Sequence, residues 1–145
     1  MFFDDLPVGA QFETDPETLS EEAIITFARQ YDPQPFHTDP EAARDTIYGG
    51  VIASGFQTLL IAFNQVLSAN IWADASMGSP GLDEIRFLRP VRPGDAIHVR
   101  ATVAASEPSK SRPDRGRTRF YYEILNQNGE VVISYYAVQL LKRRA

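Results

Sequence analysis

Apolar residues recur at helical spacing in the first half of the chain and at every second position in the second half. The first helical segment follows Thr18, with Glu21 three residues further on, which is the spacing of a capping box. Its apolar positions are Ile24, Phe27, Ala28 and Tyr31. Pro33 disfavours the α region for the residue before it, so we expect this helix to end near Tyr31, with Asp32 just beyond its last turn.

A short helix and a long helix are predicted next. Asp39 followed by Pro40 has the form of an N-cap and a first helical residue, and Tyr48-Gly49-Gly50 ends that short helix. The long helix begins near Ser54 and Gly55. Its apolar positions are Phe56, Leu59, Leu60, Phe63, Val66 and Leu67. A helix that is apolar on most sides and carries no charge is expected to be deeply buried.

From Leu82 onward the apolar period is two, which predicts strands. Predicted strands include Ile85 and Phe87, residues 97–103, and the two segments 118–125 and 131–141, which flank the hairpin signal Asn128-Gly129. A further short strand is expected at residues 11–13. The pattern therefore predicts an α+β fold, with a long buried helix against an antiparallel sheet of about five strands. Both faces of the last strand are apolar, and the sheet leaves a free edge, so we expect pairing with a second copy, as a homodimer or a dimer-based oligomer.

Composition narrows the functional class. The chain has 145 residues, which favours a single domain that spans residues 1–145. Its net charge of −5 argues against nucleic-acid binding. No run of about 18 apolar residues is present, so no membrane-spanning helix is expected. The first five residues are not basic as a signal peptide would be, and we expect a cytoplasmic protein. With no cysteine and only two histidines, neither a metal site nor a cofactor is predicted.

The residues suited to chemistry gather after the first helix. Asp32 and His37 stand five positions apart in a segment that contains three prolines, which stiffen the backbone. A stiff segment holds a carboxylate and an imidazole in a fixed relation, as general acid–base catalysis requires. The alternative is structural: Asp32 accepts backbone N–H groups in a turn, and His37 is a partly buried histidine that closes the loop.

The segment Asp32-Pro33-Gln34-Pro35-Phe36-His37 resembles the D-x-N-P-x-H signature of the MaoC-like dehydratases, the (R)-specific enoyl-CoA hydratase family. Residues 50–56 resemble the family's approach to its central helix, and residues 88–95 resemble its entry to a sheet strand. The three pieces occur in the family's order, and the resemblance covers residues 5–141. It implies the hot-dog fold, in which an antiparallel sheet wraps a long central helix, commonly as a dimer.

The resemblance also implies a reaction, the hydration of enoyl thioesters or the reverse dehydration, with an acyl-CoA thioester as substrate. By position, Asp32 and His37 would hold and activate one water molecule. The backbone N–H of Gly55 would polarise the thioester carbonyl at the start of the long helix, where the helix dipole favours an oxyanion. Ser54 and Gln34 would lie beside the substrate, although we favour a capping role for Ser54.

Three positions depart from the family pattern. Gln34 replaces the usual Asn, Tyr31 replaces Gly, and Ser54 replaces His. None of the three changes removes the acid, the base or the oxyanion donor, but each is expected to reshape the pocket or its surroundings.

Other functions remain open at this point. A hot-dog acyl-CoA thioesterase and a carrier-protein dehydratase both favour a carboxylate on the central helix, and residues 55–73 contain neither Asp nor Glu. A non-catalytic acyl-binding subunit would not need Asp32 and His37. The basic loop at residues 107–117 is interpreted as a solvated hairpin, with contact to coenzyme A phosphates as the functional alternative.

Overall fold

The computed structural model describes residues 1–144, in which six strands form one antiparallel sheet with the order β1-β4-β5-β6-β3, and β2 also pairs with β4. The strands are β1 (Gln11–Glu13), β2 (Glu17–Thr18), β3 (Gly81–Phe87), β4 (Ala96–Pro108), β5 (Arg115–Leu125) and β6 (Val131–Lys142). The helices are α1 (Glu21–Tyr31), α2 (Pro35–Thr38), α3 (Pro40–Arg44) and α4 (Gly55–Ser68), with single 3-10 turns at Phe3–Asp5 and Ala73–Ala75.

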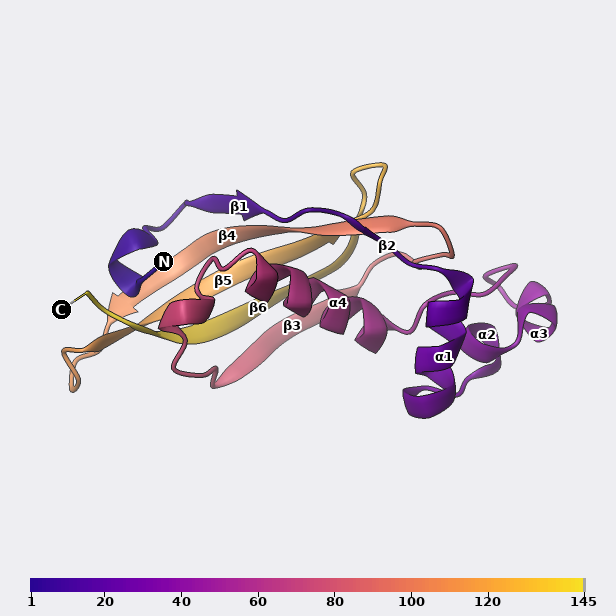
Figure 1. Ribbon diagram of the computed structural model, residues 1–145, viewed down its shortest axis with the longest axis horizontal. Coiled ribbons are helices and arrows are strands. Elements are labelled where there is room, and N and C mark those ends of the chain that lie inside the picture. Colours follow the sequence, from indigo (N-terminus) through magenta and orange to yellow (C-terminus); the bar gives the residue numbers. More distant parts are fainter. Residues whose placement is uncertain (145) are drawn as a thin grey trace.

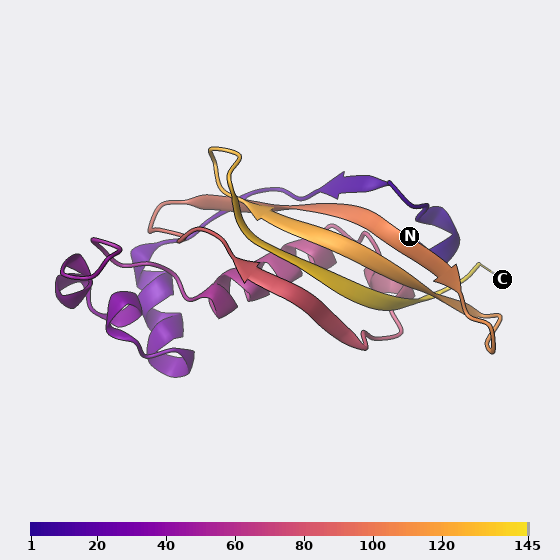
Figure 2. The same ribbon diagram turned by 180° about the vertical axis from the view of Figure 1, so that it is seen from behind.

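The long helix α4 lies along one face of the curved sheet, and α1, α2 and α3 gather beyond its N-terminal end (Figure 1). Seen from behind, the sheet covers α4 while the three smaller helices stay clear of it (Figure 2). The inner sheet positions alternate as predicted, and Val99, Phe120 and Ile124 are fully buried there. The α+β architecture, with an antiparallel sheet around a long helix, is thus confirmed.

The N-terminus of α1 differs from the prediction. Ser20 is the N-cap, and its hydroxyl oxygen accepts a hydrogen bond from the Ala23 N–H at 3.1 Å. Thr18 lies instead in the two-residue strand β2, opposite Ala96. Because Ser and Thr cap about equally well, the backbone path into the helix decides between them. The predicted end of the helix is confirmed, since Asp32 is the C-cap residue.

The burial of α4 also differs from the prediction. Phe56, Leu60 and Phe63 are 64%, 57% and 46% exposed, whereas the polar residues Gln57 and Thr58 are buried. The Gln57 amide donates to the Ala23 carbonyl at 3.1 Å, which satisfies this amide N–H group against α1. The chain therefore buries a mixed face of α4 and leaves an apolar face uncovered.

The exposed apolar face of α4 continues onto β3, the last strand of the sheet. Leu82 and Phe87 of β3 are more than half exposed, and β3 pairs with β6 along only one of its edges within residues 1–144. The last strand, β6, lies inside the sheet between β5 and β3, so the free edge at this side of the sheet belongs to β3. We call the uncovered surface the α4–β3 face; its residues are Phe56, Leu60, Phe63, Leu82, Phe87 and Leu88.

No helix among the described residues is long and apolar enough to cross a membrane.

Candidate active site

The structure brings Asp32 and His37 together at the N-terminal end of α4. Asp32 ends α1, and His37 lies on the single-turn helix α2, where a loop was predicted. Pro35 occupies the first position of α2, which suits its fixed φ and its missing N–H. This turn reverses the chain, so that Nε2 of His37 lies 3.3 Å from Oδ2 of Asp32.

The second nitrogen of the His37 ring fixes its orientation. Nδ1 lies 2.7 Å from the carbonyl oxygen of Ile52, which accepts the Nδ1–H hydrogen bond. The neutral ring therefore carries its proton on Nδ1, and the lone pair of Nε2 is free to accept a proton. Because the ring is buried, Nε2 faces Asp32 and the adjoining cavity rather than bulk solvent.

One hydrogen bond holds the Asp32 carboxylate. The Gln34 amide donates to Oδ1 at 2.6 Å. Burial raises the pKa of Asp32, but the hydrogen bond from Gln34, the nearby Ser54 hydroxyl and the positive charge that His37 carries when protonated outweigh it and hold that pKa below the usual range. Asp32 is therefore ionised at neutral pH, as a general base must be.

Ser54 also caps α4, as expected, because its hydroxyl oxygen accepts from the Phe56 N–H at 3.3 Å. The Gly55 N–H, the first of the helix, has no acceptor among the described residues. The Phe87 ring lies against the Gly55 Cα, where a β-carbon would clash with it. Gly55 thus has the free donor expected of it, and Phe87 covers that position.

A cavity of about 370 Å³ joins His37 to Gly55, and we call it the His37 cavity. Its walls include Thr58 of α4, Phe87 of β3 and Ile133 of β6. The side chain of Asp32, 16% exposed, contacts Nε2 of His37, but Asp32, Gln34 and Ser54 do not themselves line this cavity. Tyr31 does not reach this cavity, because its exposed ring packs on Phe27 with 5.1 Å between centroids.

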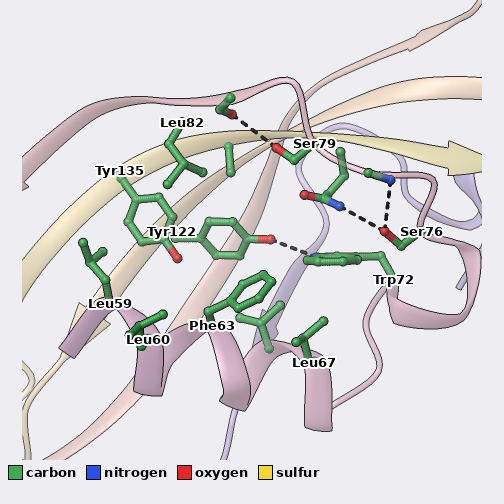
Figure 3. Close-up of a pocket in the computed structure, with 15 residues that line it drawn as sticks. Leu59, Leu60, Phe63, Leu67, Trp72, Ser76, Ser79, Leu82, Tyr122 and Tyr135 are labelled. Carbon is green, nitrogen blue, oxygen red and sulfur yellow. Dashed lines mark hydrogen bonds between the residues drawn. The ribbon is translucent and has the colours of Figure 1, made fainter. Parts of the chain in front are cut away.

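A second, apolar cavity of about 540 Å³ follows α4 toward its C-terminal end, and we call it the helix cavity (Figure 3). On β6, Ile133 lines the His37 cavity, and the next inward positions, Tyr135, Ala137 and Gln139, line the helix cavity. On α4, Thr58 lines the first and Leu59, Phe63 and Val66 line the second. The two cavities therefore follow one another along the same faces of the same two elements.

Two further residue groups lie elsewhere. The basic hairpin between β4 and β5 is at the end of the sheet opposite to α1, α2 and α3, so within one chain it is remote from His37 (Figures 1 and 2). His98 of β4 has an acidic neighbour, since its Nε2 lies 3.7 Å from Oε1 of Glu13 on β1. That contact crosses strands distant in sequence, which spacing along the chain does not reveal.

The geometry agrees with the comparison to known families. The family model of the MaoC like domain matches residues 5–119. The chain belongs to this family. Its sheet around a long helix is the hot-dog fold, as the resemblance implied.

The chain is similar in sequence or in fold to the following three proteins. A MaoC-like dehydratase structure from Rhodospirillum rubrum is 40% identical with a TM-score of 0.94, over 100% of this chain and 99% of that one. The uncharacterised protein YdeM of Bacillus subtilis is 31% identical over 77% of this chain and 79% of its own length. The (R)-hydratase PhaJ1 of Pseudomonas aeruginosa, 23% identical, shares the fold with a TM-score of 0.75 over 99% of this chain and 86% of that one.

Sequence reasoning missed two parts of the site. The Ile52 carbonyl is a backbone group that carries no residue signature, and the Phe87 ring comes from a strand more than thirty positions beyond Gly55. The extended segment at residues 50–54 brings the backbone of Ile52 beside His37. The Ile52 N–H donates to the Phe36 carbonyl at 3.0 Å in that extended segment.

Proposed function

We propose that this protein adds water to the double bond of enoyl-CoA thioesters, or removes it from the corresponding (R)-3-hydroxyacyl thioesters. The observation that carries the proposal is the 3.3 Å pairing of the Asp32 carboxylate with Nε2 of a buried His37, beside a cavity that also contains the Gly55 backbone. Membership of the MaoC-like family supports a dehydratase or hydratase of acyl thioesters in general.

In the hydration direction, one water molecule is bound by both the Asp32 carboxylate and Nε2 of His37. As the water oxygen bonds to the β-carbon, the pair accepts one proton from it, and the pair delivers one proton to the α-carbon. The protonation state of the Asp32–His37 pair is therefore the same before and after the reaction. The water supplies the hydroxyl group on the β-carbon and the hydrogen on the α-carbon. The charge that develops on the thioester oxygen is stabilised by the free Gly55 N–H and the dipole of α4.

The Phe87 ring lies against Gly55 and lines the same cavity, so it would pack beside a thioester bound there. Once the carbonyl oxygen is on Gly55, the acyl chain extends along α4 into the helix cavity, whose walls are apolar. Burial of each additional methylene there contributes about 0.8 kcal/mol.

The experiment that tests the proposal is a panel of enoyl-CoA thioesters, from crotonyl-CoA to longer chains, incubated with the purified protein. We expect loss of the enoyl absorbance and formation of the (R)-3-hydroxyacyl product. Release of free coenzyme A instead would indicate a thioesterase, and the absence of any product at every chain length would remove the assignment.

Gln34, which replaces the family Asn, offers a prediction on pH dependence. Gln34→Leu removes the hydrogen bond that favours the ionised Asp32, so the pKa of Asp32 rises. The carboxylate is then protonated earlier as the pH falls, and the acid limb of the kcat/KM profile moves to higher pH. The control is Gln30→Leu, whose amide contacts only the exposed Tyr31 hydroxyl. An unmoved acid limb in Gln34→Leu would show that Asp32 does not set it.

We also propose that a second copy of the chain covers the α4–β3 face, which gives a homodimer. Leu60→Glu places a charge in the middle of this face, and we expect it to convert a dimer into a monomer in analytical ultracentrifugation at micromolar concentration. Ile47→Glu is the matched control, because Ile47 is 94% exposed outside this face. A monomeric mass for the unmodified protein would contradict the dimer.

A further inference from the structure

The helix cavity contains phenol groups whose protons have no protein acceptor. Tyr135 is 4% exposed, its ring lines the cavity, and its hydroxyl forms no hydrogen bond with any group in residues 1–144. Burial alone accounts for the raised pKa of this hydroxyl. The hydroxyl oxygen is not sealed inside the protein, so it opens onto the cavity and can donate to a molecule there, which Phe in its place could not do.

Tyr122 stands beside Tyr135, with 5.1 Å between the ring centroids, on the neighbouring strand β5 (Figure 3). Its hydroxyl oxygen accepts a hydrogen bond from Nε1 of Trp72 at 2.9 Å, and this leaves its own proton to donate. No described residue accepts that proton. Two neighbouring O–H donors therefore line the same apolar cavity, both without an acceptor.

The position of these donors relates them to the acyl chain. Ile133 lines the His37 cavity, and Tyr135 is the next inward residue of β6, about 7 Å further along the strand. No Lys or Arg lines the helix cavity. A carboxylate would be buried there without a countercharge, which is strongly unfavourable, so an acceptor suited to this position is neutral.

We propose that the acyl group preferred by this protein carries a neutral oxygen acceptor, such as a carbonyl, ether or hydroxyl oxygen, partway along its chain, where Tyr135 and Tyr122 donate to it. The inference rests on the proposed hydratase function and specifies its substrate class. Tyr135 is then a specificity-determining residue and takes no part in the proton transfers at Asp32 and His37.

The test compares octenoyl-CoA with analogues in which each inner methylene in turn is replaced by an ether oxygen. The measured quantity is the ratio of kcat/KM for the best analogue to that for octenoyl-CoA. We expect Tyr135→Phe to lower this ratio about five- to tenfold, which is the value of one hydrogen bond. Tyr122→Phe is a second variant, although it also removes the acceptor of the Trp72 N–H.

Tyr136→Phe is the matched control, since Tyr136 is the next residue of β6 and contacts Tyr121 and Arg119 on the outer face. Thermal melting establishes that each variant is folded. An equal ratio in the unmodified protein, Tyr135→Phe and Tyr122→Phe, with octenoyl-CoA still hydrated, would overturn the inference and leave the proposed function standing. An equal fall in Tyr135→Phe and Tyr136→Phe would also overturn it. If no thioester is hydrated, the proposed function fails and the inference fails with it.

Discussion

Asp32→Asn and His37→Ala are each expected to lower kcat for hydration by about 10²-fold or more, because each removes one of the two groups that exchange protons with the reacting water. Asn keeps the size of Asp32 but is a much weaker base. His37→Ala also leaves the Ile52 carbonyl without its N–H partner, so its effect on unfolding must be measured separately. Steady-state kinetics with crotonyl-CoA, together with circular dichroism, measure both effects.

The controls apply the same substitutions outside the site. Asp39→Asn changes the N-cap of α3, where Asn caps as well as Asp. His98→Ala removes the other histidine, on β4. Both controls should retain the activity of the unmodified protein. A kcat unchanged in either Asp32→Asn or His37→Ala would place the proton transfers on other residues.

Ala137→Leu is expected to reduce selectively the turnover of long acyl chains. Ala137 is buried on the inner face of β6, opposite Leu82, and lines the helix cavity beyond Tyr135. A larger side chain there fills the space of the chain's distal methylenes, and exclusion of a methylene from such a pocket costs about 10- to 200-fold in kcat/KM. We expect that loss for octenoyl-CoA and no loss for crotonyl-CoA, which does not reach so far.

The adjacent substitution Val138→Leu is the control, because Val138 lies on the outer face of β6 and lines no part of the helix cavity. It should leave both substrates unaffected. Equal losses for crotonyl-CoA and octenoyl-CoA in Ala137→Leu would indicate general damage to the fold, and equal retention would mean that the acyl chain does not enter the helix cavity.

The sheet was predictable because its signals are local. Alternation of buried and exposed positions in β4 matches the apolar period of residues 97–103, and Asn128-Gly129 does join β5 to β6. The short elements were not predictable in the same way. The strand β2 is two residues long and exists only through its pairing with β4, and α2 is one turn that begins at Pro35. Elements of this size have no period to detect.

The candidate site likewise has a part that the sequence predicted and a part that it did not. The motif predicted the pairing of Asp32 with His37 because these residues and Gln34 lie close in sequence. The prolines between them also keep them close in space. The contact of His37 with Ile52 joins positions fifteen residues apart through a backbone oxygen, and only the folded chain shows it. Ser54 caps α4 through the Phe56 N–H, which is the role that we favoured over a hydrogen bond to the substrate.

The prediction that α4 is buried was wrong for a physical reason. An apolar pattern predicts that a surface is covered, but it does not indicate whether the same chain or another molecule covers it. Phe56, Leu60 and Phe63 satisfy the pattern, and the single chain leaves them exposed. The polar residues Gln57 and Gln65 are turned inward instead, where their amides donate to the carbonyls of Ala23 and Ile97.

Leu60, Phe63 and Leu82 belong both to the α4–β3 face and to the wall of the helix cavity. If a second chain seals that wall, mass action links turnover to protein concentration. Progressive dilution would then reduce the specific activity toward long acyl thioesters before that toward crotonyl-CoA, which uses little of the shared wall. Subunit affinity would thereby act as a selector of chain length, although no effector binds and no residue changes.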